Sequence, residues 1–213
     1  VDRRPERRSG GTEPLLTFKR GAVVHFAMSD SDIRMTTKLA GDSTFFLPFN
    51  RGNDGAAGNP PGENGSYPVS YFWERVLQKD NWLHIFHRFV LQERKEAQDV
   101  NGKTYFKEGL IFPRFHQWEG VTKMIDAVRV EGAGQPYLIQ HSAGSGKTNT
   151  IAWTAHSLIR VRRLDGEPYF HSVIVVTDRQ VLDQQLQDAI QQIEHQAGVV
   201  CAIDRSEERR VGK

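Results

Sequence analysis

The stretch YLIQHSAGSGKTNTIAW, residues 137–153, decides the fold of this chain. It sets glycines, a lysine and a hydroxyl residue between an apolar run and a helical pattern, which is the order of a nucleotide-binding phosphate loop. The usual loop has glycine, four residues, then Gly-Lys-Ser/Thr, and here His141 stands where the first glycine would be. That position lies at the exit of a strand and contributes to the turn more than to phosphate contact. We therefore predict a working phosphate loop.

Each residue type in the loop has a chemical task. Glycines tolerate positive φ and let backbone N–H groups converge on phosphate, and the dipole of the following helix adds to this. Lys147 brings a cation to the β- and γ-phosphates and to the transition-state charge, and Thr148 offers Mg²⁺ a hydroxyl ligand. The predicted cofactors are ATP and Mg²⁺. The predicted nucleotide-binding residues of the loop are Ser142, Ala143, Gly144, Ser145, Gly146, Lys147 and Thr148.

Strand and helix patterns alternate around the loop. Residues 137–140 and 172–177 have strand character, residues 147–162 have helical spacing, and a second helix leads to a third strand at 198–203. This order predicts an α/β fold with a parallel sheet and right-handed crossovers. The buried faces expected for the two helices carry Ile151, Ala155, Leu158 and Ile159 on the first, and Leu182, Leu186, Ala189 and Ile193 on the second.

The chain before the loop has a different composition. Two strand-like pieces, residues 22–28 and 32–40, flank a polar turn. Residues 50–68 are rich in Gly, Asn and Pro and indicate a long loop, and helical spacing returns over residues 70–91. We expect a domain boundary near residues 95–110, after which the strand and helix alternation begins.

Composition narrows the class of protein. The net charge is +2, with basic ends around a slightly acidic body, so charge alone does not indicate a nucleic-acid binder. One cysteine, Cys201, excludes a disulfide framework and a cysteine zinc site. The longest apolar runs, such as Val173–Val176, are only a few residues long, and the N-terminus has no signal peptide. We therefore expect a cytoplasmic protein without a membrane segment. Because neither end looks like a domain edge, we expect a fragment of a longer protein.

Two further motifs flank the phosphate loop. Residues 113–117, PRFHQ, resemble the adenine-reading glutamine motif of superfamily 2 helicases, which implies that Gln117 contacts adenine. Residues 175–186, VVTDRQVLDQQL, resemble the first DNA-backbone motif of the same superfamily, which implies DNA contact by Thr177 and Arg179. These helicases also often lack the first glycine of the phosphate loop. Three motifs in this order and spacing are a far more specific signal than any one of them.

Longer segments resemble one family within that superfamily, the restriction (R) subunit of type I restriction–modification enzymes. The resemblance runs from about Lys19 to Asp204 and is carried by VHFAMSDSDIRMTTKLAG, FLPFNRG, AAGNPP, YFWERVLQKD, IFPRFHQ, YLIQHSAGSGKTNTIAW and SVIVVTDRQVLDQQLQDAI. In that family the R subunit joins a nuclease of the PD-(D/E)xK type to two RecA-like motor domains. The motors use ATP to translocate double-stranded DNA toward a complex of methyltransferase and specificity subunits, and the nuclease then cuts. The resemblance implies these partners for the present chain.

The resemblance also implies an organisation along the chain. The expected parts are 1–18, a disordered or truncated end; 19–50, the C-terminal part of an α+β nuclease domain; 51–109, the Gly/Pro-rich loop and a helical linker; 110–204, the start of the first RecA-like motor; and 205–213, a tail outside the family pattern, either a charged helix end or an adapter artefact. The nuclease carboxylates would then precede Val1, and the Asp-Glu box would follow Asp204. We expect this piece alone to bind ATP weakly and not to hydrolyse it efficiently.

Other interpretations remain open. Glu93 and Lys95 form an E-x-K pair with Asp80 upstream, as in a metal-dependent nuclease, but the spacing over residues 82–95 favours a solvated helix end. His84 and His87 lack a third ligand at metal-site spacing, so we assign no metal beyond nucleotide-bound Mg²⁺. The alternative functions are a stand-alone superfamily 2 helicase or translocase and an inactive interaction fragment.

Overall fold

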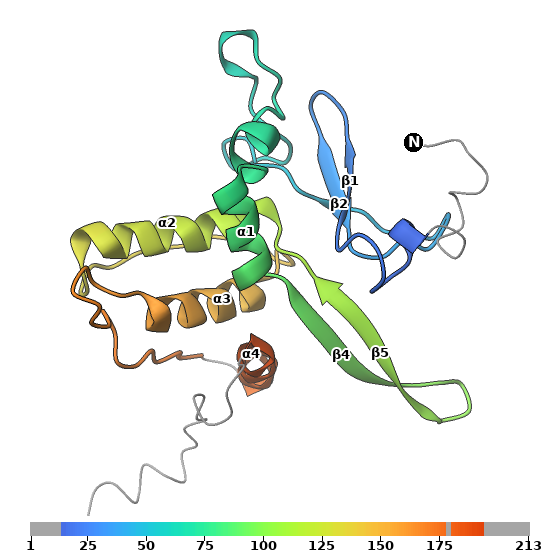
Figure 1. Cartoon of the computed structure of the whole chain (residues 1–213). Helices are drawn as coiled ribbons and strands as arrows, with labels where there is room; N and C mark the ends of the chain where they lie inside the picture. Colours follow the sequence, from blue (N-terminus) through green and yellow to red (C-terminus); the bar gives the residue numbers. More distant parts are fainter. Residues whose placement is uncertain (1–13, 178–179, 194–213) are drawn as a thin grey trace, which may run out of the picture. The chain divides into compact units, whose positions relative to one another are not determined.

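The computed structural model describes residues 14–177 and 180–193, and the fold is mixed α/β (Figure 1). The chain divides into two compact units, Val1–Gly120 and Val121–Lys213. Helix α2, Phe115–Glu131, runs through the division, and each unit is described below by itself. The domain boundaries expected from the sequence stay predictions.

A three-stranded antiparallel sheet opens the first unit. Its strands are β1 (His25–Met28), β2 (Ile33–Thr36) and β3 (Leu47–Pro48), in that order across the sheet. The hydroxyl of Ser29 accepts the backbone N–H groups of Ser31 and Asp32, which closes the turn between the first two strands. The two strand-like pieces expected around this polar turn are therefore confirmed.

A long β-hairpin forms the second sheet of this unit. Strand β4, Leu91–Gln98, pairs antiparallel with β5, Thr104–Ile111 (Figure 1). At the tip, the Asp99 carboxylate accepts the N–H groups of Asn101 and Lys103, each at 2.8 Å. Gly102 sits there at φ +77°, a conformation that favours glycine.

Short helices complete the first unit. These are 3-10 turns at Pro14–Leu16 (η2) and Glu63–Gly65 (η3), a π-helical turn at Phe72–Val76 (η4), and α-helix α1 at Lys79–Arg88. The helical spacing seen over residues 70–91 thus corresponds to two helical segments, and the second of them ends at Arg88. Residues 50–68 contain no α-helix and no strand longer than an isolated bridge, as expected for a long loop.

The core of the first unit is aromatic. Phe49 is fully buried, and its ring meets those of Phe26, Phe72 and Phe115 at centroid distances of 5.2, 6.1 and 6.0 Å. All three pairs are edge-to-face, the geometry that aromatic quadrupoles favour. The Arg75 guanidinium lies over the rings of Phe115 and Trp118 while forming an ion pair with Glu119 at 2.7 Å. This core joins β1, the residue that follows β3, η4 and the start of α2.

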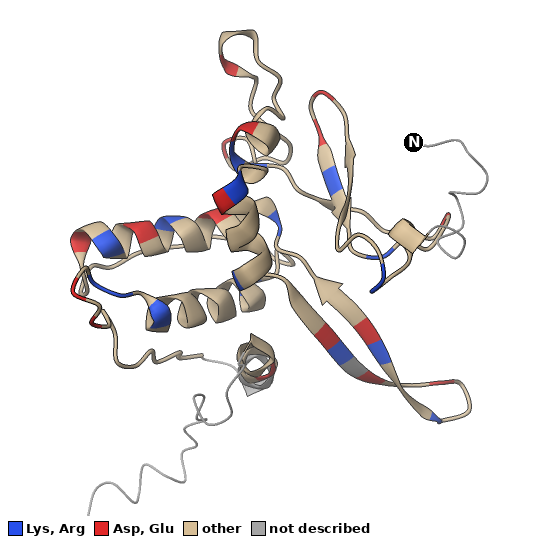
Figure 2. Cartoon of the chain, in the orientation of Figure 1, with Lys and Arg blue, Asp and Glu red and all other residues tan. Residues whose placement is uncertain are grey.

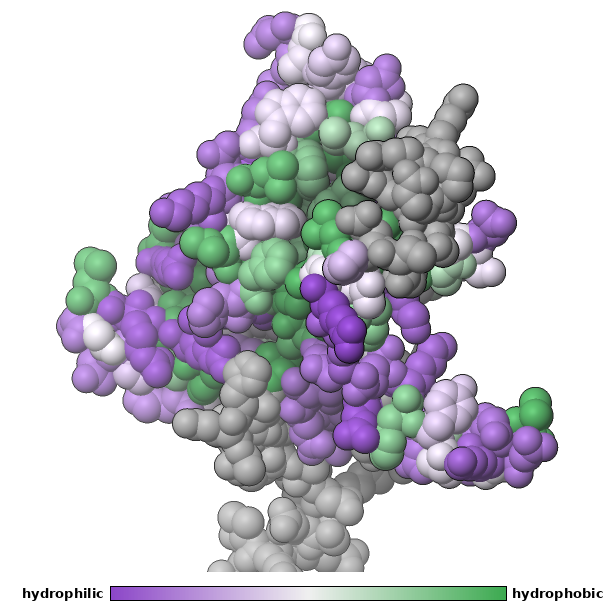
Figure 3. All heavy atoms as spheres, turned by 45° about the vertical axis from the view of Figure 1, so that its right-hand side comes forward, coloured by the Kyte–Doolittle hydropathy of each residue, from purple (hydrophilic) through white to green (hydrophobic). Residues whose placement is uncertain are grey.

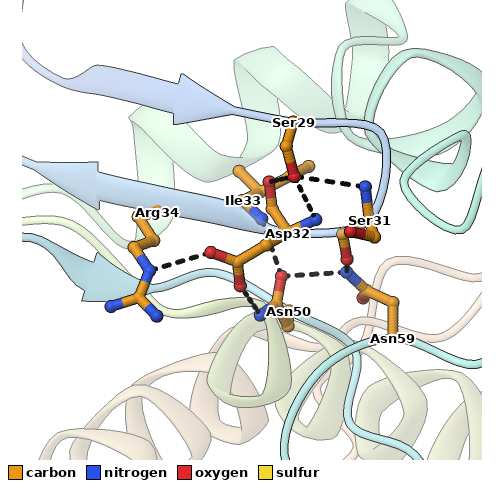
Figure 4. Close-up of polar contacts among 7 residues, drawn as sticks. All are labelled: Ser29, Ser31, Asp32, Ile33, Arg34, Asn50 and Asn59. Carbon is orange, nitrogen blue, oxygen red and sulfur yellow. Dashed lines mark hydrogen bonds and ion pairs between the residues drawn. The ribbon is translucent and has the colours of Figure 1, made fainter.

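A polar cluster closes the Gly/Asn/Pro-rich loop at its base (Figure 4). Asn50 donates to the Asp32 carboxylate at 2.6 Å and accepts the backbone N–H of Ile33 at 2.9 Å. Asn59 donates to the carbonyl of Ser31 and to Asn50, and it accepts the backbone N–H of Arg51. The side-chain amides of Asn50 and Asn59 therefore hold both ends of segment 51–58, the first part of this loop, at the β1–β2 turn.

Two helices pack together in the second unit. α3 spans Lys147–Arg160 and α4 spans Gln180–Ile193, as the sequence predicted, and the His156 ring nitrogen Nε2 lies 2.8 Å from the Ile190 carbonyl between them. The buried face expected for α4 is confirmed for its described members, Leu186, Ala189 and Ile193.

The expected buried face of α3 was wrong. Its buried side chains are Thr150, Ala152, Trp153 and His156, whereas Ile151 is 41% exposed. Trp153 offers a larger apolar surface than any aliphatic residue of the helix, and it sets which face is buried. The predicted face was based on the spacing of aliphatic residues and did not include Trp153.

The segments expected to be the first two parallel strands have no helix or strand assignment and carry no strand pairing among residues 121–177 and 180–193. They include Leu138, Ile174 and Val176, which are exposed. The third expected strand, residues 198–203, lies outside the described residues. A RecA-like parallel sheet is therefore not shown. Parallel strands require partners supplied across long crossovers, whereas the hairpins of the first unit need only a turn.

Candidate nucleotide-binding site

The phosphate loop leads directly into α3. Gly146 is the N-cap residue of this helix at φ 82° and ψ 37°, and Gly144 has φ 71°. Both values lie in the left-handed region, where glycine is favoured, so the sequence places glycine where the backbone requires it. No side chain caps the first turn of α3, and that turn holds no acidic residue. A helix N-terminus with these properties is suited to an anion.

Lys147 folds back over the loop that it follows. Its ammonium donates to the backbone carbonyls of His141 and Ser142 at 3.0 and 2.9 Å. Residues 142–144 are exposed, as is Lys147, while Ser145 is buried. The cation is thus held at the open side of the loop, at the place where a phosphate would be bound.

The residues present fit a nucleotide phosphate with its Mg²⁺. A β-carbon added to Gly144 would meet no atom within 4 Å, so the space beside this glycine is open. Thr148 lies in the first turn of α3, next to the lysine, and its hydroxyl is the type of oxygen ligand that Mg²⁺ takes in phosphate loops. Lys147 and Thr148 could therefore hold the phosphates and the ion, respectively.

Gln117 is buried at the start of α2, with 4% of its surface exposed. Its side-chain oxygen accepts the backbone N–H of Arg114 at 2.9 Å. Arg114 precedes the first helical residue and Gln117 is the third, so this bond is one half of a capping box. This hydrogen bond does not test the predicted adenine contact. It gives Gln117 a second role, as a cap of helix α2. Sequence spacing did not reveal that role.

The two predicted DNA contacts fall at the edge of the described structure. Thr177 is the last described residue before the gap at 178–179 and is partly exposed. Arg179 lies outside the described residues, so its role stays a prediction. α4 begins immediately afterwards, at Gln180, in agreement with the helix expected there.

The E-x-K pair does not lie on a helix end, and that expectation was wrong. α1 ends at Arg88, and Glu93 and Lys95 lie on strand β4, opposite Gly109 and Lys107 of β5. Pairing with β5, which lies later in the chain, overrides the helical spacing of these residues. Within residues 14–177 and 180–193, no group of three or more His, Cys, Asp and Glu side chains could hold a metal ion.

Charged and apolar side chains both lie on the surface of the described part of the chain. Basic and acidic residues are interspersed along α2, β4 and β5 (Figure 2). On the face drawn in Figure 3, apolar side chains reach the surface between polar ones. Among the described residues, Leu15 and Phe45 are exposed apolar side chains. None of the described helices combines the length and apolar character needed to cross a membrane.

Comparison with known proteins gives one family match, which covers the phosphate loop. Residues 116–208 match the family model of the SWI2/SNF2 ATPase. The matched region contains Gln117, the phosphate loop and the segment from Thr177 to Arg179. This match points to a superfamily 2 helicase-like ATPase, and the family implies ATP as the ligand together with Mg²⁺. No curated protein and no solved structure matches the chain.

Proposed function

We propose that the chain is part of the ATP-dependent, DNA-translocating endonuclease subunit of a type I restriction–modification system. In this role it binds ATP and double-stranded DNA and helps to drive cleavage of unmodified foreign DNA. Its partners are the methyltransferase and specificity subunits, and it acts in the cytoplasm. The motor part of this proposal is supported by the SWI2/SNF2 match, and the restriction part by the segment resemblance from Lys19 to Asp204.

The observation that carries the motor function is the phosphate loop at the start of α3. Two left-handed glycines, an uncapped helix N-terminus and a lysine held over the loop occur together in a segment of a helicase-like ATPase family. A chance glycine-rich turn would not require all three features.

The residues of the chain divide the work in this proposal. Lys147 neutralises phosphate charge, and it does so most strongly as charge develops in the transition state. Thr148 holds the Mg²⁺ ion, and Gln117 selects adenine. Thr177 and Arg179 contact the DNA backbone at the N-terminus of α4, where phosphate contact positions the motor without reading bases. Bound ATP supplies the free energy for movement along DNA.

The test is a cleavage assay with the complete protein assembled with its methyltransferase and specificity subunits. The substrate is circular DNA with one unmethylated recognition site, and ATP hydrolysis is followed in parallel. We expect cleavage that requires ATP and disappears when the site is methylated. ATP hydrolysis on DNA without any cleavage would instead identify a stand-alone helicase or translocase. Failure to bind millimolar ATP·Mg²⁺ in calorimetry would identify an inactive interaction module.

A further inference from the structure

The outer half of the β4–β5 hairpin is exposed on both of its faces. In β5 the residues from Thr104 to Lys107 are all exposed, and the successive rings of Tyr105 and Phe106, which lie on opposite faces, are 49% and 54% exposed. In β4, Arg94 and Glu96 are exposed as well. A two-stranded hairpin on its own is marginally stable in water. Burial of apolar surface therefore does not explain why this arm is ordered.

Polar and cation–π contacts order the arm instead. The guanidinium carbon of Arg94 lies 3.9 Å from the centre of the Phe106 ring on the neighbouring strand. The Asp99 carboxylate closes the tip through two backbone N–H groups, and Glu108, nearer the base, forms an ion pair with Lys19 at 2.6 Å. An arm that is ordered in advance loses less conformational entropy when it binds a partner.

The register of the two strands sorts the charges of the arm. Lys95 stands directly opposite Lys107, and the next pair on the same face is Ala97 with Tyr105. We call these four positions the lysine face. Glu93 shares this side of the ribbon, but it lies nearer the base and is partly buried. Like charges directly opposite each other destabilise a pair of strands, so an anion bound at the lysine face would relieve a repulsion that the free hairpin carries.

We propose that the lysine face of the β4–β5 hairpin binds the phosphate backbone of double-stranded DNA. The inference rests on the proposed function, in which DNA is the substrate. Lysine is depleted at protein–protein interfaces and common at DNA phosphates, so the charges favour DNA over a protein partner. The major groove of B-DNA is about 12 Å wide and about 8.5 Å deep, and it admits a two-stranded β-ribbon. The four outer residue pairs span about 13 Å along the strands, which is long enough to enter this groove.

The experiment measures binding of the complete protein to duplexes that lack a recognition site, at several salt concentrations. Each phosphate contact contributes about 0.9 to the slope of log affinity against log salt. We expect Lys107→Gln to lower this slope by about one and Lys95→Gln/Lys107→Gln to lower it by about two. Lys79→Gln is the matched control, at an exposed lysine on α1 in the same compact unit, and it should leave the slope unchanged.

Two further measurements separate DNA contact from a structural role of the hairpin. Glu96→Gln removes an exposed acid from the same arm, so it should strengthen DNA binding, the opposite of the lysine variants. The thermal unfolding midpoint of Lys95→Gln/Lys107→Gln should equal or exceed that of the wild type, because the substitution removes a like-charge pair. A lower midpoint accompanied by an unchanged salt slope would show that these lysines support the fold and would overturn the inference.

The remaining outcomes distinguish this inference from the proposed function. Wild-type DNA binding with an unchanged slope in Lys95→Gln/Lys107→Gln would overturn the role of the hairpin and leave the proposed function standing. Weaker assembly with the methyltransferase and specificity subunits, at an unchanged slope, would assign the hairpin to a protein partner and would overturn the DNA contact. Absence of DNA binding by the wild-type protein would overturn the proposed function together with this inference.

Discussion

The two compact units differ in how their elements are held together. In the unit up to Gly120, strands pair with neighbours in the sequence, and an aromatic core centred on Phe49 joins them. In the unit from Val121, α3 and α4 pack together, but the apolar segments 137–140 and 172–177 have no strand partners among residues 121–177 and 180–193. The first unit thus contains local pairings and a dense core, and the second contains the phosphate loop. We infer that changes in the first unit act on stability and that changes in the loop act on chemistry.

The largest expected effect is that of Lys147→Ala in the complete enzyme. The variant should lose ATP hydrolysis, translocation and cleavage, because the ammonium stabilises charge on the transferred phosphate. Its free energy of unfolding should stay within a few tenths of a kcal/mol of the wild-type value, since the side chain is exposed and bonds to loop carbonyls among the described residues. Assembly with the methyltransferase core and DNA methylation should survive.

Lys123→Ala, at an exposed lysine on α2, is the control for this change. ATP hydrolysis, cleavage and unfolding are measured on both variants. Cleavage at the wild-type rate by Lys147→Ala would separate the nuclease from this motor and would contradict the restriction-subunit proposal.

The opposite behaviour is expected for Phe49→Ala. Removing this fully buried ring from the aromatic core should lower the free energy of unfolding by about 3–5 kcal/mol. Phe45→Ala, at a side chain that is 75% exposed, should change it by less than about 0.5 kcal/mol. Denaturant unfolding of the two variants measures the difference. Similar losses in both would show that the aromatic cluster does not dominate the stability of the first unit.

Gln117 is expected to affect both stability and nucleotide binding, because it caps α2 and is also the predicted adenine contact. Gln117→Ala should weaken ATP binding by about tenfold with little change for GTP, as expected when one hydrogen-bonding pair is lost. Gln117→Glu keeps the oxygen that accepts the Arg114 N–H but loses the amide donor, so it should keep the helix cap and still lose the preference for ATP. Nucleotide titrations and unfolding curves separate the two roles. Equal losses for ATP and GTP would leave Gln117 with the capping role alone.

The polar cluster predicts a pH dependence confined to the first unit. The pKa of Asp32 is lowered by hydrogen bonds from Asn50 and Arg34. A carboxylate with a depressed folded-state pKa stabilises the fold above its unfolded pKa of about 3.9, and this contribution is lost as pH falls through the folded value. Asp32→Asn should therefore show a shallower loss of stability below about pH 4 than the wild type. Asp54→Asn, at the exposed loop, is the control, and equal acid slopes for Asp32→Asn and wild type would remove Asp32 from this role.

The smallest effect is expected for Arg179→Ala. If Arg179 contacts DNA phosphate, the variant should bind all sequences more weakly by the same factor, and the slope of log affinity against log salt should fall by about one. Arg163→Ala, whose guanidinium lies over the Tyr169 ring, serves as the control. Binding is measured at several salt concentrations on unrelated duplexes. A loss that depends on base sequence would contradict a backbone contact.

Prediction from the sequence succeeded where the signal is local. The β1–β2 hairpin follows from two strand-like pieces around the polar turn Ser29–Asp32, and α3 follows from the helical spacing after the glycines. It failed where the local structure depends on contacts between residues that are distant in the sequence. Glu93 was assigned to a helix end because the spacing around it is helical, but β5 pairs with it and makes a strand. The predicted buried face of α3 did not include Trp153, which the structure buries.

The sequence by itself determined the phosphate loop, because positive φ at Gly144 and Gly146 and a cation at Lys147 are properties of residue type and spacing. It also indicated a superfamily 2 helicase-like ATPase, to which the SWI2/SNF2 match points. Only the tertiary structure decided that Gln117 caps α2, that Asn50 and Asn59 fasten the loop 51–58, and that Lys147 rests against the His141 carbonyl. Each of these depends on where two side chains or backbone groups meet in space. Hydrogen bonds act over about 3 Å, so folding rather than composition sets which partners come within reach.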